Sequence, residues 1–365
     1  MKRILVIATR QIGDVLLTTP LIRAAREQWP QAQVDVLGFA GTLGMLRGNP
    51  DVHELVETPA RLGWQGFRSL VRRLWRRYDL ALVTQPSDRA HLLAWIAAKQ
   101  RSGLLPEHGG SNWWKKLLLD HAVVSAGDRG ESHVTVEKLA LLAPWMDTAN
   151  TVPRVIAPAR APLDDALDRV VEDGAVVVHA PSMWSYKQWP AAHFAALVRG
   201  LLAAGRQVVF TGSASERDQA CVAPLMALGE SPDVVDAAGQ LDFNQLATLL
   251  QRAALYIGPD TSVSHLAAAV GTPVIAIFGP TNPMRWAPWP ADAPSKSPFE
   301  RVVPIQVAGN VTLLQSSLHC VPCGRAGCED HRDSRSDCLQ DIGPERVLAE
   351  ALRVIEGTQP RASAQ

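Results

Sequence analysis

One stretch of the chain, residues 255–280, constrains the fold more than any other. It begins with a short apolar strand, turns at Gly258-Pro259 and continues into a helix of small residues. Gly271 is expected to close that helix, and Val274–Phe278 is expected to form the next buried strand. Two buried strands joined by a helix indicate a parallel βαβ unit, which occurs in sheets that carry helices on their faces.

The turn between this strand and its helix has the chemistry of an anion site. Asp260 is expected to cap the helix, and Thr261, Ser262 and Ser264 follow in its first turn. The unpaired N–H groups at a helix N-terminus, together with the helix dipole, attract a diphosphate. Ligands of open α/β sheets also bind at the carboxyl ends of strands. The stretch therefore indicates a phosphate site, although an ordinary capped turn can have the same residues.

Length and composition favour two globular domains. The chain has 365 residues, which exceeds one typical core, and its 47% hydrophobic and 20% charged residues are typical of a soluble α/β protein. The formal net charge is zero, so we expect no nucleic-acid partner. No apolar run approaches the ~20 residues of a membrane span, and the N-terminus lacks the features of a signal peptide. We therefore expect a cytoplasmic protein.

Strand and helix patterns alternate through both halves of the chain. The first half predicts strands at Ile4–Ala8, Val34–Phe39, Asp79–Thr84 and Arg101–Leu104, and helices at Val15–Trp29, Gly66–Tyr78 and Arg89–Lys99. The second half predicts strands at Ala175–Ala180, Gln207–Thr211 and Val234–Asp236, and helices at Leu163–Glu172, Ala191–Ala204 and Phe243–Gln251. This alternation predicts an α/β fold with two doubly wound, Rossmann-like domains that face each other across a cleft.

A proline-rich stretch near the middle of the chain, residues 147–162, has no helical period and predicts a linker. We place the two domains at residues 1–157 and 158–343. A final helix at 344–356 is expected to pack back towards the N-terminal domain. The tail, 357–365, is expected to be disordered.

Three more loops after predicted strands carry polar residues that suit transfer chemistry. Asp14 follows the first strand, where its carboxylate can take a proton from a hydroxyl group or can cap a helix. Lys187, with Ser182 and Ser185 in the same loop, can neutralise a phosphate leaving group, although it can equally be a surface lysine. Glu216 can accept hydrogen bonds from ribose hydroxyls or can be favoured by the helix dipole.

Four motifs together resemble one enzyme family. They are G-D-V-L-L-T-T-P at 13–20, K-x-W-P at 187–190, G-S-x-x-E at 212–216, and G-P-D-T-S-V-S-H-L-A-A-A-x-G-T-P-V-I-A-I-F-G-P-T-x-P from 258. The chain resembles the ADP-heptose:lipopolysaccharide heptosyltransferases, which are glycosyltransferase family nine and have the GT-B fold. The motifs span most of the chain and occur in the family's order.

The resemblance implies an inverting transfer of L-glycero-D-manno-heptose from ADP-heptose to the inner-core oligosaccharide of lipopolysaccharide. Asp14 matches the family's proposed general base, and Lys187 matches the lysine at the donor phosphates. The other matching donor-site positions are Glu216 at the ribose, Leu241 at the adenine, and Asp260, Thr261, Ser262 and His265 in the long motif. Some relatives have glycine at the position of Ser262. The family needs no catalytic metal or cofactor, because lysine and helix stabilise the charge on ADP.

Two other functions fit the same motifs. A transferase of this family could use another sugar nucleotide, which a panel of donors would separate. A catalytically silent protein that binds sugar nucleotides would have the same fold, and ADP binding without turnover would support it. The presence of both Asp14 and Lys187 favours an enzyme.

A cysteine-rich segment at 319–338 lies outside these motifs. Cys320, Cys323, Cys328 and Cys338 are four of the five cysteines, and their spacing is C-x2-C-x4-C-x9-C. In a cytoplasmic chain such a cluster favours a structural metal over disulfides, with zinc ahead of an iron–sulfur cluster, although the thiols can also be unliganded. Similar cysteine-bearing tails occur in relatives that resemble the third core heptosyltransferase, so the segment favours that branch.

Two aromatic and basic stretches, Trp64–Tyr78 and Trp113–Lys116, combine apolar side chains with arginines and lysines. Either stretch can lie on the anionic cytoplasmic face of the inner membrane, close to a lipid-linked acceptor. Either can also be an amphipathic helix that packs on its own domain and leaves its basic face in water.

Overall fold

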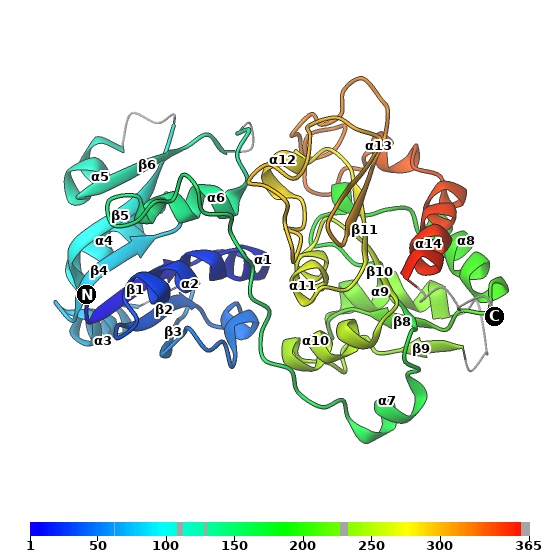
Figure 1. Ribbon diagram of the computed structural model, residues 1–365, viewed down its shortest axis with the longest axis horizontal. Coiled ribbons are helices and arrows are strands. Elements are labelled where there is room, and N and C mark those ends of the chain that lie inside the picture. The colour runs from blue at the N-terminus through cyan, green and yellow to red at the C-terminus, as the bar shows by residue number, and fades with distance from the viewer. Residues whose placement is uncertain (62, 108–111, 128–129, 227–232, 359–365) are drawn as a thin grey trace, which may run out of the picture. The chain divides into compact units, whose positions relative to one another are not determined.

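The computed structural model describes residues 1–61, 63–107, 112–127, 130–226 and 233–358. They form two compact units that divide between Ala159 and Arg160, and residues 295–297 group with the first unit. Lys296 links this short segment to the first unit, because its ammonium donates to the carbonyls of Thr148 and Ala149 at 2.6 and 2.8 Å. Each unit contains one mainly parallel sheet flanked by helices (Figure 1). The predicted α/β fold with two Rossmann-like sheets is therefore confirmed.

The first unit is built on a six-stranded sheet in the order β3-β2-β1-β4-β5-β6, in which each neighbouring pair is parallel. Its strands are β1 (Arg3–Ala8), β2 (Gln33–Phe39), β3 (Glu54–Thr58), β4 (Tyr78–Val83), β5 (Ala98–Pro106) and β6 (His121–Ser125). Its helices are α1 (Ile12–Leu16), α2 (Thr19–Gln28), α3 (Trp64–Leu74), α4 (Asp88–Ala97), α5 (Trp113–Leu118) and α6 (Val134–Leu139). Parallel neighbours require long crossover connections, and these helices supply them.

Helices cover both faces of the first sheet, as its near-continuous apolar strands predict. On one face, Leu21 of α2 and Leu139 of α6 share a buried cluster with residues of β1 and β2. On the other face, Leu74 of α3 and Leu93 of α4 share a second buried cluster with the opposite side chains of the same strands. The alternation of side chains along each strand thus divides the core into two layers.

The single helix predicted at Val15–Trp29 is two helices in the structure. α1 ends at Leu16, and α2 begins at Thr19 with Pro20 in its first turn. A proline in the first turn lacks only an N–H group that would be unpaired there, whereas deeper in a continuous helix it would remove a hydrogen bond. The break therefore places the proline where a helix tolerates it.

The second unit is built on a seven-stranded sheet in the order β12-β13-β11-β10-β7-β8-β9, and only the β12–β13 pair within it is antiparallel. Its strands are β7 (Val176–His179), β8 (Val208–Thr211), β9 (Val234–Asp236), β10 (Leu255–Pro259), β11 (Val274–Phe278), β12 (Ile305–Ala308) and β13 (Val311–Gln315). Its helices are α7 (Asp165–Val170), α8 (Ala191–Ala203), α9 (Glu216–Met226), α10 (Phe243–Arg252), α11 (Ser262–Val270), α12 (Pro283–Trp286), α13 (Asp337–Gln340) and α14 (Pro344–Thr358).

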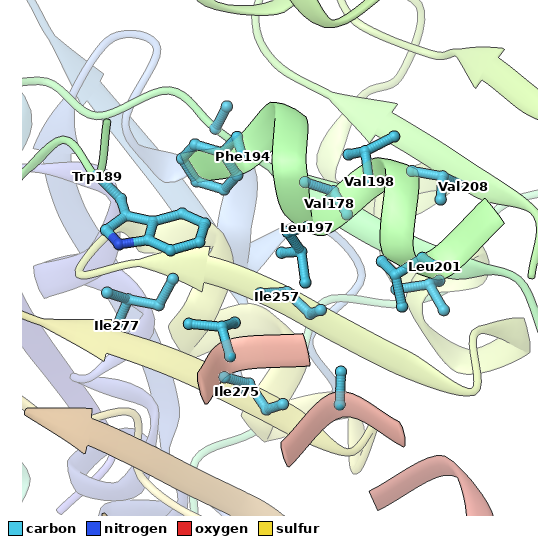
Figure 2. Packing of buried hydrophobic residues seen from close by; sticks show 14 of the residues in the cluster. Val178, Trp189, Phe194, Leu197, Val198, Leu201, Val208, Ile257, Ile275 and Ile277 are labelled. Atoms are coloured by element: carbon cyan, nitrogen blue, oxygen red, sulfur yellow. The ribbon is translucent and has the colours of Figure 1, made fainter. Parts of the chain in front are cut away.

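Figure 2 shows the core on one face of the second sheet. Phe194, Leu197 and Leu201 project from one side of α8 into a cluster that contains Val178 of β7 and Ile257 of β10. Their spacing of three and four residues places them on one helix face. This packing fixes the central strands, whose carboxyl ends carry the predicted donor residues.

The terminal helix α14 packs on this same core. Val347, Ala351 and Ile355 lie in the buried cluster, and α14 contacts α8. Gly200 of α8 permits the contact, because a Cβ there would lie 2.3 Å from Cδ2 of Leu348. The apolar stripe of this helix is therefore buried within the second unit, and the expectation that the helix also lies towards the N-terminal domain stays a prediction.

In the described ranges, no helix is both long enough and apolar enough to cross a membrane. The tail predicted at 357–365 lies outside the described residues from residue 359 onward, and α14 extends to Thr358.

Candidate active site

Three neighbouring strands of the second sheet end at the loops that carry the predicted donor residues. β10, β7 and β8 lie side by side in that order. Asp260 follows β10, Lys187 lies in the loop after β7, and Glu216 begins the helix after β8. Because parallel strands end at one edge, the sheet brings these distant residues to the edge where open α/β sheets bind ligands.

Lys187 and Asp260 form an ion pair, with Nζ 2.5 Å from Oδ2. The Asp260 side chain is 8% exposed and the Lys187 side chain 21% exposed, so the ammonium is the more accessible partner. The carboxylate restricts the lysine to a position beside the end of β10. The sequence predicted both residues as site residues, but it did not predict their direct contact.

The helix after β10 begins one residue later than predicted. Thr261 has the extended backbone of an N-cap residue, and Ser262 is the first helical residue of α11. The carboxylate of Asp260 binds Lys187 instead of capping the helix. Gly271 ends α11 in the left-handed conformation with a φ of 93°, as predicted. The first-turn N–H groups of α11 therefore lie next to the Lys187–Asp260 pair.

A buried tyrosine lies beneath this turn. The Tyr256 hydroxyl is 3.0 Å from the Ser264 hydroxyl, and Ser264 donates to the carbonyl of Pro259 at 2.5 Å. Burial raises the pKa of Tyr256 well above its ordinary value, so its hydroxyl stays protonated. Gly258 is required here, because a Cβ would lie 2.3 Å from the tyrosine oxygen. These contacts fix the turn from which α11 begins, and His265 of α11 is itself only 6% exposed.

The remaining predicted donor residues differ in exposure. Ser182 is 4% exposed, and its hydroxyl accepts a hydrogen bond from the backbone N–H of Trp184 at 3.4 Å. Ser185 and Glu216 are exposed. Leu241 is partly buried, directly before the residue that caps α10. Ser185 and Glu216 are thus accessible to a ligand, whereas Ser182 is part of the loop's internal structure.

The cysteine-rich segment packs against the loop after β7. The Ser185 N–H donates to the carbonyl of Arg332 at 3.1 Å, and the Ser336 hydroxyl donates to the carbonyl of Tyr186 at 2.7 Å. The Arg332 guanidinium lies 4.4 Å from the centre of the Trp184 ring, a cation–π distance. Residues 319–338 therefore help to set the position of the loop that carries the predicted phosphate-binding lysine.

The four cysteines of this segment lie near one another. Cys320, Cys323 and Cys328 are exposed, and Cys338 is 5% exposed. Burial, reinforced by the other three thiols, raises the pKa of Cys338 to about 12. In the part of the chain that the structure describes, no group of three or more His, Cys, Asp or Glu side chains is arranged to hold a metal ion. The other three thiols thus lie within electrostatic range of Cys338, and the four do not form a closed site.

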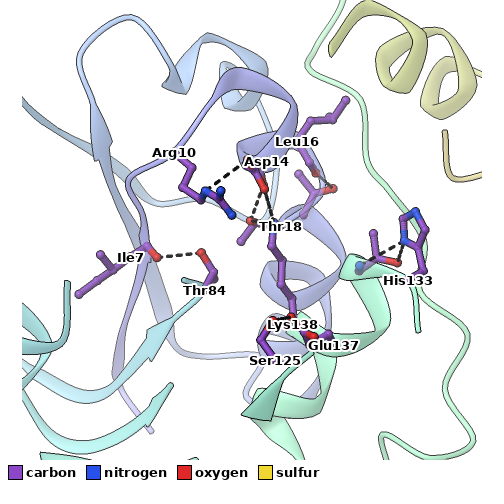
Figure 3. A network of polar contacts seen from close by, with 12 residues as sticks. Ile7, Arg10, Asp14, Leu16, Thr18, Thr84, Ser125, His133, Glu137 and Lys138 are labelled. Atoms are coloured by element: carbon purple, nitrogen blue, oxygen red, sulfur yellow. Dashed lines mark hydrogen bonds and ion pairs between the residues drawn. The ribbon is translucent and has the colours of Figure 1, made fainter. Parts of the chain in front are cut away.

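The predicted base, Asp14, lies in the first unit on α1, directly after β1. Figure 3 shows the polar network around it. Nε of Arg10 lies 3.7 Å from Oδ2, and Nζ of Lys138 lies 3.9 Å from Oδ1. The Asp14 side chain is 13% exposed. The carboxylate is therefore flanked by two cations and still reaches solvent at the carboxyl end of the strand.

Sequence reasoning missed Lys138 on α6. This lysine is 2% exposed, and its ammonium donates to the Asp14 carbonyl at 2.7 Å and to the Thr18 hydroxyl at 3.1 Å. The sequence has one signal for it, a lysine within the apolar helical run V-T-V-E-K-L. A helix with this pattern is expected to be buried, and a lysine is seldom buried without a partner. The partner lies 124 residues earlier in the chain, so the sequence does not identify it.

Comparison with known proteins identifies the family. The model of glycosyltransferase family 9 (heptosyltransferase) matches residues 67–297. Lipopolysaccharide heptosyltransferase 3 of Escherichia coli is 31% identical over 291 residues, which cover 76% of this chain and 83% of that protein. The structure of E. coli ADP-heptose lps heptosyltransferase II matches with a TM-score of 0.72 at 21% identity, covering 98% and 99% of the two chains. E. coli heptosyltransferase WaaC with ADP matches with a TM-score of 0.69 at 16% identity, covering 96% and 99%.

The two sheets, the strand-end loops and these matches define a glycosyltransferase built from two α/β domains. The chain belongs to glycosyltransferase family 9, the heptosyltransferases, as its four motifs predicted. The matched range contains Lys187, Glu216 and residues 260–265, and it begins after Asp14.

Proposed function

We propose that this enzyme transfers L-glycero-D-manno-heptose from ADP-heptose to the inner-core oligosaccharide of lipopolysaccharide. The observation that carries the proposal is the 31% identity to lipopolysaccharide heptosyltransferase 3 over 76% of the chain. The same relative and the cysteine-rich segment favour the third of the core heptosyltransferases. ADP as the donor nucleotide is supported by the similarly folded WaaC structure, which contains it.

The donor diphosphate is proposed to bind at the start of α11. Lys187 supplies positive charge, and the first-turn N–H groups from Ser262 onward supply hydrogen-bond donors, with the Thr261 hydroxyl beside them. Asp260 holds Lys187 in position through the 2.5 Å ion pair. Ser185 is exposed in the same loop and donates to the phosphates. Together these groups supply the positive charge and the hydrogen-bond donors that a diphosphate needs.

The nucleoside is proposed to bind along the neighbouring loops. Glu216 accepts hydrogen bonds from the ribose hydroxyls, and Leu241 packs on the adenine. Ser182 and His265 are 4% and 6% exposed, so we infer that they position the loop and the helix for the donor.

Asp14 is the proposed general base. Its carboxylate takes the proton of the acceptor hydroxyl while the hydroxyl oxygen forms a bond to C1 of the heptose and the C1–O bond to the diphosphate breaks. Attack from the face opposite the diphosphate inverts the configuration at C1. Lys187 and α11 stabilise the negative charge that develops on ADP, so charge neutralisation does not require a catalytic metal. Lys138 and Arg10 hold the carboxylate in place.

Mass spectrometry of truncated core acceptors tests the proposed reaction. The enzyme is incubated with each acceptor and with ADP-heptose, ADP-glucose or a UDP-sugar in separate reactions. A heptose-sized mass gain with ADP-heptose alone is the expected result, and the acceptor that gains mass identifies the branch. A gain with another donor would replace the proposed substrate. ADP binding without any gain would instead support a silent binding protein.

We also propose that Cys320, Cys323, Cys328 and Cys338 bind a structural metal, zinc ahead of an iron–sulfur cluster. The support is their gathering in one segment, where the other three thiols lie close enough to Cys338 to act on it electrostatically. Metal binding would deprotonate the thiols and draw them together. The metal content of the purified protein tests this idea, with C320S/C323S as the variant and C221S as the control. We expect the double variant to lose one equivalent of metal and the C221S control to keep it. Wild-type protein that purifies without metal, with all five of its cysteines reactive as free thiols, would contradict the proposal.

Because the proposed acceptor is linked to a lipid, we infer that the enzyme works at the cytoplasmic face of the inner membrane. This placement requires a surface of the protein that binds lipid.

A further inference from the structure

Three helices of the first unit lie next to one another on one face of the sheet. α3 contacts α4, and α4 contacts α5 (Figure 1). The inner side chains of α3 and α4, including Leu74 and Leu93, belong to the buried cluster on that face, and α5 packs beside α4. The outer sides of the three helices therefore form one continuous surface, which we call the α3–α5 surface.

This surface carries large apolar side chains that the core does not use. They are Trp64, Trp75, Leu92, Trp95, Trp113 and Leu117, with exposures of 71%, 60%, 38%, 47%, 68% and 75%. The structure describes all eleven tryptophans of the chain, and the four that are exposed lie within α3–α5 or directly after α3. Leu92 and Trp95 lie three residues apart on one side of α4. The exposed tryptophans thus come from three separate segments and gather on one face.

The same surface is basic. Arg68, Arg72, Arg76 and Lys116 are exposed, and within the described residues none of the four forms an ion pair. The three helices contain a single acidic residue, Asp88, which pairs with Lys115 at 2.5 Å. The surface therefore presents positive charge between its tryptophans, with almost no negative charge.

We propose that the α3–α5 surface binds the surface of an anionic phospholipid bilayer. Tryptophan rings favour the headgroup region, where their apolar body and N–H group are both satisfied. Arginine and lysine extend their charged ends to anionic headgroups while their stems lie along apolar groups. A protein interface, by contrast, has few charges at its centre, whereas here the charges alternate with the tryptophans. Charge complementarity thus selects a bilayer as the occupant.

This inference deepens the proposed function by naming the surface that faces the membrane, but lipid binding does not require catalysis. Co-sedimentation with vesicles, without donor or acceptor, tests it. Wild-type protein is expected to sediment with phosphatidylglycerol/phosphatidylethanolamine vesicles and not with pure phosphatidylcholine. R68Q/R72Q is expected to weaken binding roughly 30-fold, since each basic residue near the surface contributes about fivefold. W95S/W113S is expected to weaken it at least about tenfold.

Matched variants in the second unit provide the controls. V302S/V307S removes side chains that are 52% and 59% exposed, and R199Q/R301Q removes two exposed arginines. Both controls are expected to bind vesicles like the wild type, and thermal unfolding checks that every variant is folded. Binding that the α3–α5 substitutions do not change would overturn the proposal. The proposal would also be overturned if light scattering without lipid showed a dimer of the wild-type protein that the same substitutions abolish.

Transfer to a short-chain, lipid-free acceptor separates this inference from the proposed reaction. All α3–α5 variants are expected to retain that transfer. If the wild-type protein transfers heptose but does not bind vesicles, only the membrane-surface proposal is contradicted. If it binds vesicles but does not transfer heptose, only the proposed reaction is contradicted.

Discussion

At the scale of single residues, the ion pair between Lys187 and Asp260 carries the proposed donor chemistry. The lysine is the cation that the nearly buried carboxylate holds beside the start of α11. We predict that K187M weakens ADP binding about 10- to 100-fold, because hydrogen bonds to charged groups contribute roughly 1.5–3 kcal/mol. Isothermal titration calorimetry measures the change.

K99M is the control for this substitution, since Lys99 is a largely exposed lysine of the first unit. Its ADP affinity is expected to equal that of the wild type. An unchanged ADP affinity in K187M would remove Lys187 from the donor site.

His179, at the end of β7, makes stability depend on pH. Its Nδ1 lies 3.0 Å from the Thr211 hydroxyl, and burial, opposed in part by Asp218, lowers its pKa from 6.5 to about 4. Between these two values the unfolded chain binds a proton that the native protein does not, so stability falls as the pH falls through this window. We predict that the loss between pH 7 and pH 4.5 is about 2 kcal/mol smaller in H179Q.

Urea unfolding at both pH values measures this difference. The other titrating groups are the same in the wild type and the variant, so the comparison isolates His179. Equal losses in the two proteins would show that His179 does not cause the pH dependence.

At the scale of elements, the contact between α8 and α14 determines where the terminal helix lies. A Cβ at Gly200 would lie 2.3 Å from Leu348, so a larger side chain must separate the two helices. We predict that G200L lowers the free energy of unfolding by about 1–3 kcal/mol, the usual cost of overpacking. A203L, at an exposed position of the same helix, is expected to change it by less than about 0.5 kcal/mol. Equal effects of the two substitutions in denaturant titrations would contradict the observed packing.

The elements also show what the sequence predicts and what it leaves undetermined. The 255–280 stretch predicted its strand, helix and closing Gly271, because apolar runs and glycine act locally. It misplaced the cap by one residue, since Asp260 has a partner in a distant loop. The sequence predicted the terminal helix itself, but not its packing on α8, which depends on the small Gly200 of that helix.

At the scale of the whole molecule, the motifs predicted the family, and the alternation of strand and helix patterns predicted the two sheets. The roles of the candidate site residues stay predictions. Contacts between segments that are distant in the chain could not be predicted from the sequence. The lysine that holds Asp14 lies 124 residues away, and the cysteine-rich segment meets the loop after β7 through Arg332 and Ser336. Both depend on how the chain returns to the same strand end, which local pattern does not encode.

The central proposal is that Asp14 is the general base of the transfer reaction. The most direct test compares D14N with the wild type for heptose transfer by mass spectrometry and for ADP-heptose binding by calorimetry. Removal of a general base should slow transfer about a thousandfold and leave donor affinity unchanged, because the donor groups lie on other loops. Transfer by D14N at close to the wild-type rate would contradict the claim.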